Sequence, residues 1–346
     1  MTGSFTAYIK SSLLISSVFF LMFTLVIRFA GVRLTRLADK LADITGIGEA
    51  LFGAVLLGGI TSIAGIIASV TAAYNGYGQL AVSNAIGGIA AQTTFLAIAD
   101  ISYRKANLEH ASASLQNIMM GALLIGQLIL IVMVASTPGI EFTGFHPASI
   151  LFIVIYIAGI YLISKAKKSK MWTPRKTSQT VIDKKHFADL PKGEQAKLWL
   201  EFILFSIIVG CSGFIVAHSG IGIAENSGLS ETFVGALFTA ISTSLPELVV
   251  SIAAVKQGSL NLAVGNIIGG NTFDVLFVAF ADFAFLQGSI YHVLSSQQIF
   301  LIGLTILMTT VLIIGLLFRQ KYGPGKIGWE SVLILAFFIF GYLLML

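Results

Sequence analysis

The chain has 346 residues, of which 56% are hydrophobic and only 11% are charged. A soluble domain usually carries about 25% charged residues, so this composition excludes an ordinary soluble domain and predicts an all-α polytopic membrane protein that lies in the lipid bilayer. The formal net charge of +5 is not interpreted as nucleic-acid binding. In a membrane protein the position of the basic residues carries more information than their sum.

Apolar runs of about 20 residues are long enough to cross a bilayer as helices. We predict ten transmembrane helices, at residues 11–31, 47–74, 79–99, 114–136, 147–164, 198–219, 229–255, 260–283, 297–318 and 328–345. The first run is interpreted as a membrane helix and not as a signal peptide. It is long, no small-residue cleavage site follows it, and arginines crowd its C-terminal end.

The basic residues predict how these helices are oriented. Ten alternating spans create two sets of loops, and one set holds all 21 lysines and arginines except Lys10. Because Lys and Arg accumulate on the cytoplasmic side, we expect both termini outside and the basic segment 165–197 inside, most simply in an inner (plasma) membrane. The segment is interpreted as a solvated connector, and contact with anionic lipid stays an alternative.

An internal repeat crosses this connector. Residues 61–100 align with residues 243–282 without a gap, at an offset of 182, with 16 identities in 40 positions. Many shared residues are small or polar, which apolar composition alone does not explain. They include Thr61/Thr243, Ser62/Ser244, Asn84/Asn266, Gly87/Gly269 and Asp100/Asp282.

The helix count adds a constraint to the repeat. Each half contains five predicted helices, an odd number, so the second half must enter the membrane from the opposite side. We therefore predict two inverted repeats, residues 1–164 and 198–346, joined by the linker 165–197. In transporters with inverted repeats, the substrate site lies near the bilayer midplane where the repeats meet.

Two carboxylates lie inside predicted spans. Glu247 and Asp274 each cost at least about 2.5–3.5 kcal/mol at the bilayer centre, so such residues usually mark a site or a pathway. Oxygen-bearing side chains flank them, and hard cations such as Na⁺ and Ca²⁺ prefer oxygen ligands. Pro246 removes a backbone donor and frees carbonyl groups nearby. By contrast, Asp100 and Asp282 end their predicted helices and are expected to face water.

The motifs "TSLPEL" at 243–248 and "GNIIGGNTFD" at 265–274 resemble the second signature repeat of the sodium/calcium exchanger, or cation/calcium antiporter, superfamily. The resemblance implies a secondary active antiporter that moves Ca²⁺ or a related cation in exchange for Na⁺ or H⁺ by alternating access. It also implies which residues bind the cation. The expected ligands are Thr243, Ser244, Glu247, Asp274 and a carbonyl near Ala240, with Asn271 beside them and Thr61 and Ser62 from the first repeat.

The first repeat departs from the family pattern. Gly65 stands where the repeat aligns Glu247, and Gln92 stands opposite Asp274 but retains an amide oxygen, so we include it in the site. The remaining two carboxylates balance one Ca²⁺, two Na⁺ or two H⁺, which favours electroneutral exchange. The alternative is a degenerate relative that binds cations without transport, as a sensor or partner protein. The sequence contains no H-E-x-x-H, G-x-S-x-G or P-loop motif, so we expect neither an enzyme nor a cofactor beyond the transported cations.

Overall fold

The computed structural model describes residues 2–45, 59, 61–103, 106–112, 114–138, 144–166, 173, 175, 191–323 and 327–346, and its regular structure there is helical. Eight helices are long and apolar enough to cross a membrane, which confirms an integral membrane protein at this level. Two shorter apolar helices, Ile63–Tyr74 and Trp329–Leu344, lie in the second and tenth predicted spans. Residues 47–58 of the second span are outside the described residues, and the ten-helix count stays a prediction.

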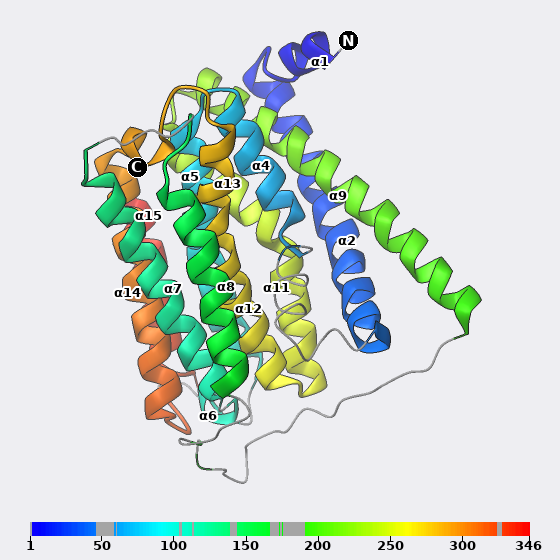
Figure 1. Ribbon diagram of the computed structural model, residues 1–346, viewed down its shortest axis with the longest axis vertical. Helices are drawn as coiled ribbons and strands as arrows, with labels where there is room; N and C mark the ends of the chain where they lie inside the picture. Colours follow the sequence, from blue (N-terminus) through cyan, green and yellow to red (C-terminus); the bar gives the residue numbers. More distant parts are fainter. Residues whose placement is uncertain are drawn as a thin grey trace.

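The elements form a bundle of helices (Figure 1). They are α1 (Thr2–Ile9), α2 (Leu13–Thr45), α4 (Ile63–Tyr74), α5 (Gly78–Ser102), α6 (Leu108–Ala111), α7 (Leu115–Ala135), α8 (Ala148–Ala166), α9 (Lys192–Ser227), α10 (Glu231–Phe233), the π-helix η2 (Val234–Thr239), α11 (Ala240–Gln257), α12 (Leu260–Asp274), α13 (Leu276–Ala284), the 3₁₀-helix η3 (Ile290–Val293), α14 (Ser296–Phe318) and α15 (Trp329–Leu344).

The long helices α2 and α9 pack along each other at one side of the bundle and run in opposite directions (Figure 1). Glycines let both approach the inner helices closely. A Cβ added to Gly31 of α2 would overlap the Pro246 ring of α11, and one added to Gly213 of α9 would lie 2.5 Å from the carbonyl oxygen of Ala64 in α4. These two contacts are equivalent in the internal repeat. Gly213 lies 182 positions after Gly31, and Pro246 lies 182 positions after Ala64.

Helices α5, α12 and α13 form the buried centre. In α5 only a few residues near the ends reach the surface. The α4–α5 and α11–α12 turns lie at opposite ends of the bundle (Figure 1). Each turn contains a glycine with positive φ, Gly76 at 89° and Gly258 at 83°, a conformation that glycine adopts without steric cost. The same helix–turn–helix structure therefore occurs in both halves of the sequence, and the two copies run through the bundle in opposite directions.

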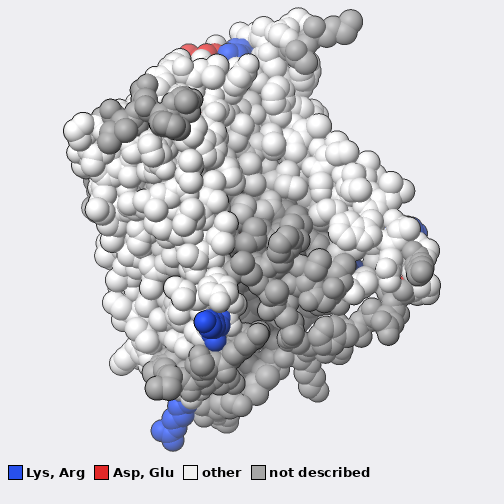
Figure 2. Space-filling model, in the orientation of Figure 1, with Lys and Arg blue, Asp and Glu red and all other residues white. Residues whose placement is uncertain are grey.

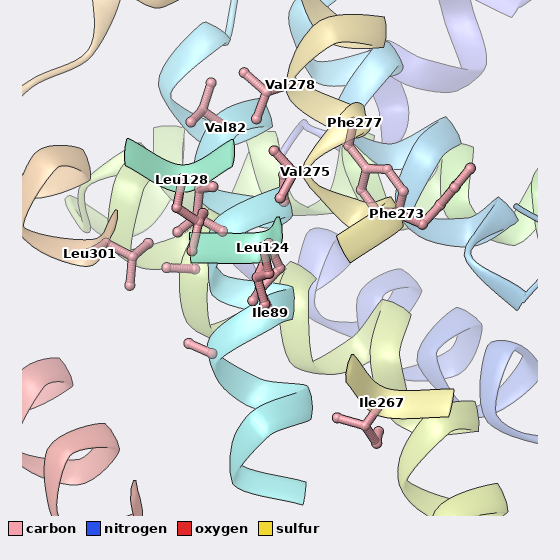
Figure 3. Packing of buried hydrophobic residues seen from close by; sticks show 14 of the residues in the cluster. Val82, Ile89, Leu124, Leu128, Ile267, Phe273, Val275, Phe277, Val278 and Leu301 are labelled. Atoms are coloured by element: carbon pink, nitrogen blue, oxygen red, sulfur yellow. The ribbon is translucent and has the colours of Figure 1, made fainter. Parts of the chain in front are cut away.

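Apolar side chains fill this centre, including Val82 and Ile89 of α5 and Leu301 of α14 (Figure 3). The outer helices instead expose large apolar residues, such as Leu21 and Phe29 of α2 and Leu200 of α9. The face in Figure 2 is predominantly uncharged. Exposed large apolar side chains on helices long enough to cross a bilayer fit contact with lipid.

The prediction that Asp100 and Asp282 face water is wrong, because both side chains are fully buried. Oδ1 of Asp100 accepts a 2.7 Å hydrogen bond from the backbone N–H of Leu108, and Oδ1 of Asp282 accepts one of 2.9 Å from Ile290. Connecting segments fold back over the helix ends and supply these donors. The position of an aspartate at the end of a predicted helix does not reveal that a connecting segment will bury it.

The second oxygen of each aspartate links the two halves of the chain. Oδ2 of Asp100 accepts from Gly328 N at 2.9 Å and from Ser331 Oγ at 3.0 Å, at the start of α15. Oδ2 of Asp282 accepts from His146 N at 2.8 Å and Ser149 Oγ at 2.7 Å, at the start of α8. Every partner of Asp282 differs from the corresponding partner of Asp100 by 182 positions. Each half therefore anchors the last helix of the other.

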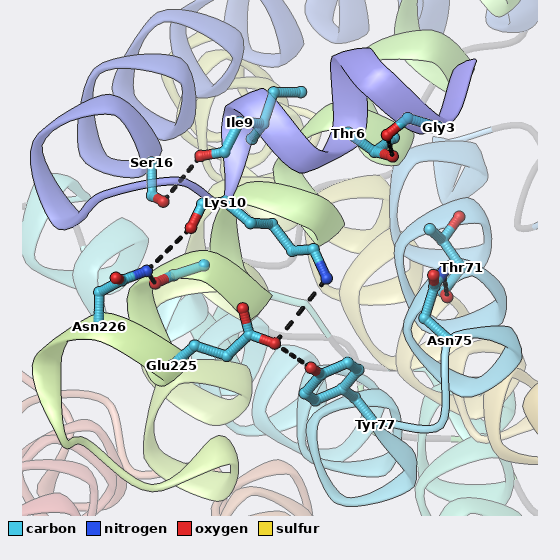
Figure 4. Close-up of polar contacts among 11 residues, drawn as sticks. Gly3, Thr6, Ile9, Lys10, Ser16, Thr71, Asn75, Tyr77, Glu225 and Asn226 are labelled. Carbon is cyan, nitrogen blue, oxygen red and sulfur yellow. Dashed lines mark hydrogen bonds and ion pairs between the residues drawn. The ribbon is translucent and has the colours of Figure 1, made fainter. Parts of the chain in front are cut away.

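At the end of the molecule that holds the N-terminus, a polar cluster joins three segments (Figure 4). Tyr77 Oη donates a hydrogen bond to Oε1 of Glu225, and Lys10 Nζ lies 3.8 Å from the same oxygen. Asn226 Nδ2 donates to the Lys10 carbonyl at 3.0 Å. This terminal cluster ties the α1–α2 connection to the end of α9 and to the turn before α5.

Candidate cation site

A small cavity lies where α4, α5, α11 and α12 meet. Its volume is about 10 Å³, and about 10–15 Å³ is needed to hold one water, so it accommodates about one water-sized species. The lining residues come from both halves of the sequence: Ser62, Gly65, Asn84, Gly88, Gln92, Thr243, Ser244, Glu247, Asp274 and Phe277. The structure thus brings together six of the nine residues predicted for the site.

Asp274 lies at the last position of α12 and is held by the opposite half. Ser62 Oγ donates a 2.7 Å hydrogen bond to its Oδ1, and Gln92 Nε2 donates one of 2.6 Å to its Oδ2. Hydrogen bonds to an ionised acceptor are short and about twice as strong as neutral ones. The carboxylate is therefore oriented by two donors from the first repeat, in a fully buried position.

The same contact recurs with the two halves exchanged. Gln92 Nε2 also donates to Ser244 Oγ at 3.3 Å, and this pair is the repeat equivalent of Asp274 with Ser62. Gln92 Oε1 has no hydrogen-bond donor among the described residues. Oxygens that lack a donor suit a cation, since a buried acceptor without a partner costs about 1–3 kcal/mol.

Glu247 lies on α11 directly after Pro246 and borders two cavities. The larger has a volume of about 150 Å³ and is also lined by Thr61, by Thr35 and Asp39 of α2, and by Asn266 of α12. Oε2 of Glu247 is buried with no donor in the described part of the chain. The carboxylate therefore stands between the small cavity and the larger one, and Thr61 lies on the side of the larger one.

Two of the predicted ligands line neither of these cavities. The carbonyl oxygen of Ala240 accepts a 3.2 Å hydrogen bond from Thr243 Oγ1, which also donates to the Thr239 carbonyl at 3.0 Å. Asn271 Nδ2 donates to Thr93 Oγ1 at 3.0 Å. The π-helix η2 directly precedes this region, and single-turn π-helices are frequent at functional sites.

Sequence reasoning did not place Asn84, Gly88 and Phe277 in the site. Asn84 Nδ2 donates to Ser69 Oγ at 2.9 Å and to the Gly65 carbonyl at 3.2 Å, which fixes α5 against α4. Its identity with Asn266 in the repeat was a usable signal. Nothing in an apolar run distinguishes Phe277 from the other phenylalanines of the chain.

The sequence profile of the family described as "Sodium/calcium exchanger protein" matches residues 15–165 and 197–346. These ranges cover most of the chain and both predicted halves, so the chain belongs to this family. The family is one of membrane antiporters for inorganic cations and not of enzymes.

One curated relative and two solved structures illustrate the similarity. The putative antiporter CaxA of Alkalimonas amylolytica is 26% identical over 273 residues, which span 77% of this chain and 79% of the relative. The crystal structure of the H⁺/Ca²⁺ exchanger CAX superposes with a TM-score of 0.67 at 15% identity, covering 98% of this chain and 86% of that one. The sodium–calcium exchanger NCX_Mj gives 0.58 at 17% identity, with coverages of 95% and 98%. At such identities the structures establish the fold alone.

Proposed function

We propose that this protein is a secondary active antiporter that exchanges Ca²⁺ or a related cation for Na⁺ or H⁺ by alternating access. One observation carries the proposal: a cavity of about one water volume is lined by Glu247 and Asp274 together with hydroxyl and amide groups from both halves of the sequence. Carboxylate, hydroxyl and amide oxygens are the ligands that Na⁺ and Ca²⁺ prefer. The names of the relatives, which include H⁺/Ca²⁺ and sodium–calcium exchangers, agree with this chemistry.

Two inverted five-helix repeats are part of this proposal. The matched contacts of Asp100 and Asp282, and of Ser62 and Ser244, support an axis that relates the halves. In the proposed orientation both termini lie outside, the segment 165–197 is cytoplasmic, and the membrane is the inner (plasma) membrane.

The charges of the site indicate the stoichiometry. Among the described residues, Glu247 and Asp274 are the only acidic ones that line the small cavity, and no basic one lines it or the larger cavity, which also contains Asp39. Two negative charges balance one divalent cation, two Na⁺ or two H⁺. Exchange of one Ca²⁺ for two monovalent cations then moves no net charge across the membrane.

Access to the site supports the alternating-access part of the proposal. The larger cavity extends from Glu247 to Thr35 and Asp39, in the half of α2 that is predicted to lie at the cytoplasmic side. The terminal cluster of Lys10, Tyr77, Glu225 and Asn226 joins the helices at the opposite end. Helices α2 and α9 are the moving elements in this proposal, since they contact the inner helices through Gly31 and Gly213.

Flux measurements on purified protein in liposomes test this function. Ca²⁺ uptake is followed while a Na⁺ or pH gradient is applied, for the wild type, Glu247→Gln, Asp274→Asn and the control Glu194→Gln. Glu194 is exposed in the first turn of α9, far along the chain from the site. We expect flux to be lost in the first two variants and kept in the control. Transport that survives Glu247→Gln contradicts the site assignment.

Binding without transport is the second candidate, and Gly65 at the position of Glu247 favours it. The two candidates differ in a simple comparison. A sensor would be stabilised against heat by Ca²⁺ through Asp274 and would show no flux, whereas an antiporter shows both.

A further inference from the structure

Asn84 and Asn266 occupy equivalent positions in the two repeats, yet their surroundings differ. Asn84 on α5 bridges to α4, because its Nδ2 donates to Ser69 Oγ at 2.9 Å and to the Gly65 carbonyl at 3.2 Å. Asn84 is 1% exposed. Asn266 on α12 is exposed and lines the larger cavity. The same amide therefore joins two helices in the first half and borders open space in the second.

The groups that correspond to the acceptors of Asn84 lie on the wall of the same cavity. Their repeat equivalents are the hydroxyl of Ser251 and the carbonyl of Glu247. Both residues belong to α11 and line the larger cavity, as Asn266 of α12 does. The cavity, with a volume of about 150 Å³, thus lies where the equivalent hydrogen bonds between α11 and α12 would form. Movement of α12 against α11 would close it and bring the Asn266 amide to both acceptors.

A pair of equivalent glycines shows the same difference between the halves. A Cβ added to Gly87, which lies three residues after Asn84, would be 2.4 Å from the carbonyl oxygen of Ala236 in η2. Among the described atoms, an added Cβ at Gly269 would meet only the sulfur of Met120, at 3.4 Å. The first contact is with backbone, whereas the second is with the end of a flexible side chain. Helix α5 is therefore packed tightly at a position where α12 has room to move.

We propose that Asn266 is a positioning residue for transport, which closes the larger cavity by donating to Ser251 Oγ and to the Glu247 carbonyl while Asn84 releases its own acceptors. This inference rests on the alternating access of the proposed function. The bond to the carbonyl of Glu247 would hold the backbone that carries a proposed cation ligand. Because both repeats supply an amide and a serine hydroxyl, Asn84 with Ser69 in one and Asn266 with Ser251 in the other, the two states form equivalent hydrogen bonds. Small differences in free energy then decide which state is populated.

The alkylation rate of a cysteine in the larger cavity measures how open that cavity is. Val250 lines it, so Val250→Cys is introduced with Cys211→Ser and the purified protein is treated with a water-soluble maleimide. We expect Asn84→Ala to lower the rate, because the ratio of open to closed protein should fall about fivefold for each hydrogen bond removed. Asn266→Ala should keep the rate at or above the parent value, and the double variant should return towards it. Asn75→Ala is the control, since its amide donates within α4 to the Thr71 carbonyl and lines neither cavity.

The signs of these changes distinguish the proposed role from a purely structural one. An Asn84→Ala rate that is unchanged or raised overturns the inference, and so does an Asn266→Ala rate that is lowered. If Asn84→Ala does not fold, Ser69→Ala removes one of the same hydrogen bonds and should lower the rate in the same way. Ca²⁺ flux in liposomes addresses the proposed function separately. A wild type without flux contradicts that function, whereas the alkylation rates decide the role of the two amides.

Discussion

Gln92 and Asp274 occupy the same position in the two halves of the sequence, and they touch: Gln92 Nε2 donates a 2.6 Å hydrogen bond to Oδ2 of Asp274. Two residues at equivalent positions of a repeat can contact each other only if both lie close to the axis that relates the two repeats. The site therefore lies at the meeting point of the repeats. The contact pairs an amide with a carboxylate, so the site is asymmetric at its centre although its surroundings are nearly symmetric.

Replacing this amide by a second carboxylate should make the site dependent on a cation. In Gln92→Glu two like charges about 4 Å apart repel by about 4 kcal/mol at an effective dielectric constant of 20. We expect a lower unfolding midpoint in chelator and a larger rise on adding Ca²⁺ than in the wild type. Gln92→Met, which has a similar size and no charge, serves as the control. An equal Ca²⁺ response of the two variants would disprove this role of position 92.

The close approach of α9 to α4 should be sensitive to a single methyl group. A Cβ at Gly213 would lie 2.5 Å from a backbone oxygen of Ala64, which cannot move as a side-chain tip can. Gly213→Ala should therefore lower both stability and transport rate. Gly210→Ala is the matched control on the same helix, because its added Cβ would lie 3.6 Å from Ile63, an ordinary contact. Equal behaviour of the two variants in the flux and midpoint assays would argue against a tight helix contact.

The two buried aspartates should contribute to stability in the same way. Ser331→Ala removes one donor to Asp100, and Ser149→Ala removes one donor to Asp282. A hydrogen bond to a charged group contributes about 1.5–3 kcal/mol, so both variants should unfold at lower temperature or denaturant concentration. Scanning calorimetry in detergent measures the effect. If only one variant is destabilised, the two anchors are not equivalent in energy.

Glu109 of α6 makes stability depend on pH. Burial raises the pKa of its carboxyl well above the usual range, and the charges of Asp100 and Glu330 raise it further. In the unfolded chain this group loses its proton near pH 4.3, whereas in the folded protein it keeps the proton to higher pH. Its contribution to stability is therefore fully present below that pH and falls as pH rises towards the folded-state pKa, by at most about 1.4 kcal/mol per pH unit.

Glu109→Gln should reduce this slope. We expect the variant to match the wild type at low pH and to become relatively more stable as pH rises, as measured by thermal midpoints across a pH series. The exposed control Glu194→Gln should keep the wild-type profile. A wild-type slope that persists in Glu109→Gln would show that another group is responsible.

Much of this protein could be predicted from the sequence, because the physical causes are local. A helix must satisfy its own backbone groups in lipid, so apolar runs of about 20 residues reveal the membrane helices. A charge in such a run is costly, so Glu247 and Asp274 were identifiable as candidate site residues, and the repeat in register predicted Ser62, Ser244 and Gln92 beside them, where the cavity lining has them. The positions of Ala240, Asn271 and Thr61 relative to the cavity did not follow from the motif.

The tertiary structure decided what the sequence by itself does not determine. It buries Asp100 and Asp282 under donors from the opposite half, it sets Gln92 against Asp274, and it turns the ring of Phe277 but not that of Phe95 to the cavity. Each of these outcomes depends on contacts between segments far apart in the sequence, some by more than 200 residues, or on different packing around two identical residues. Hydropathy and register identify the candidate residues of the site, and only packing across the two halves determines which of them line the same cavity.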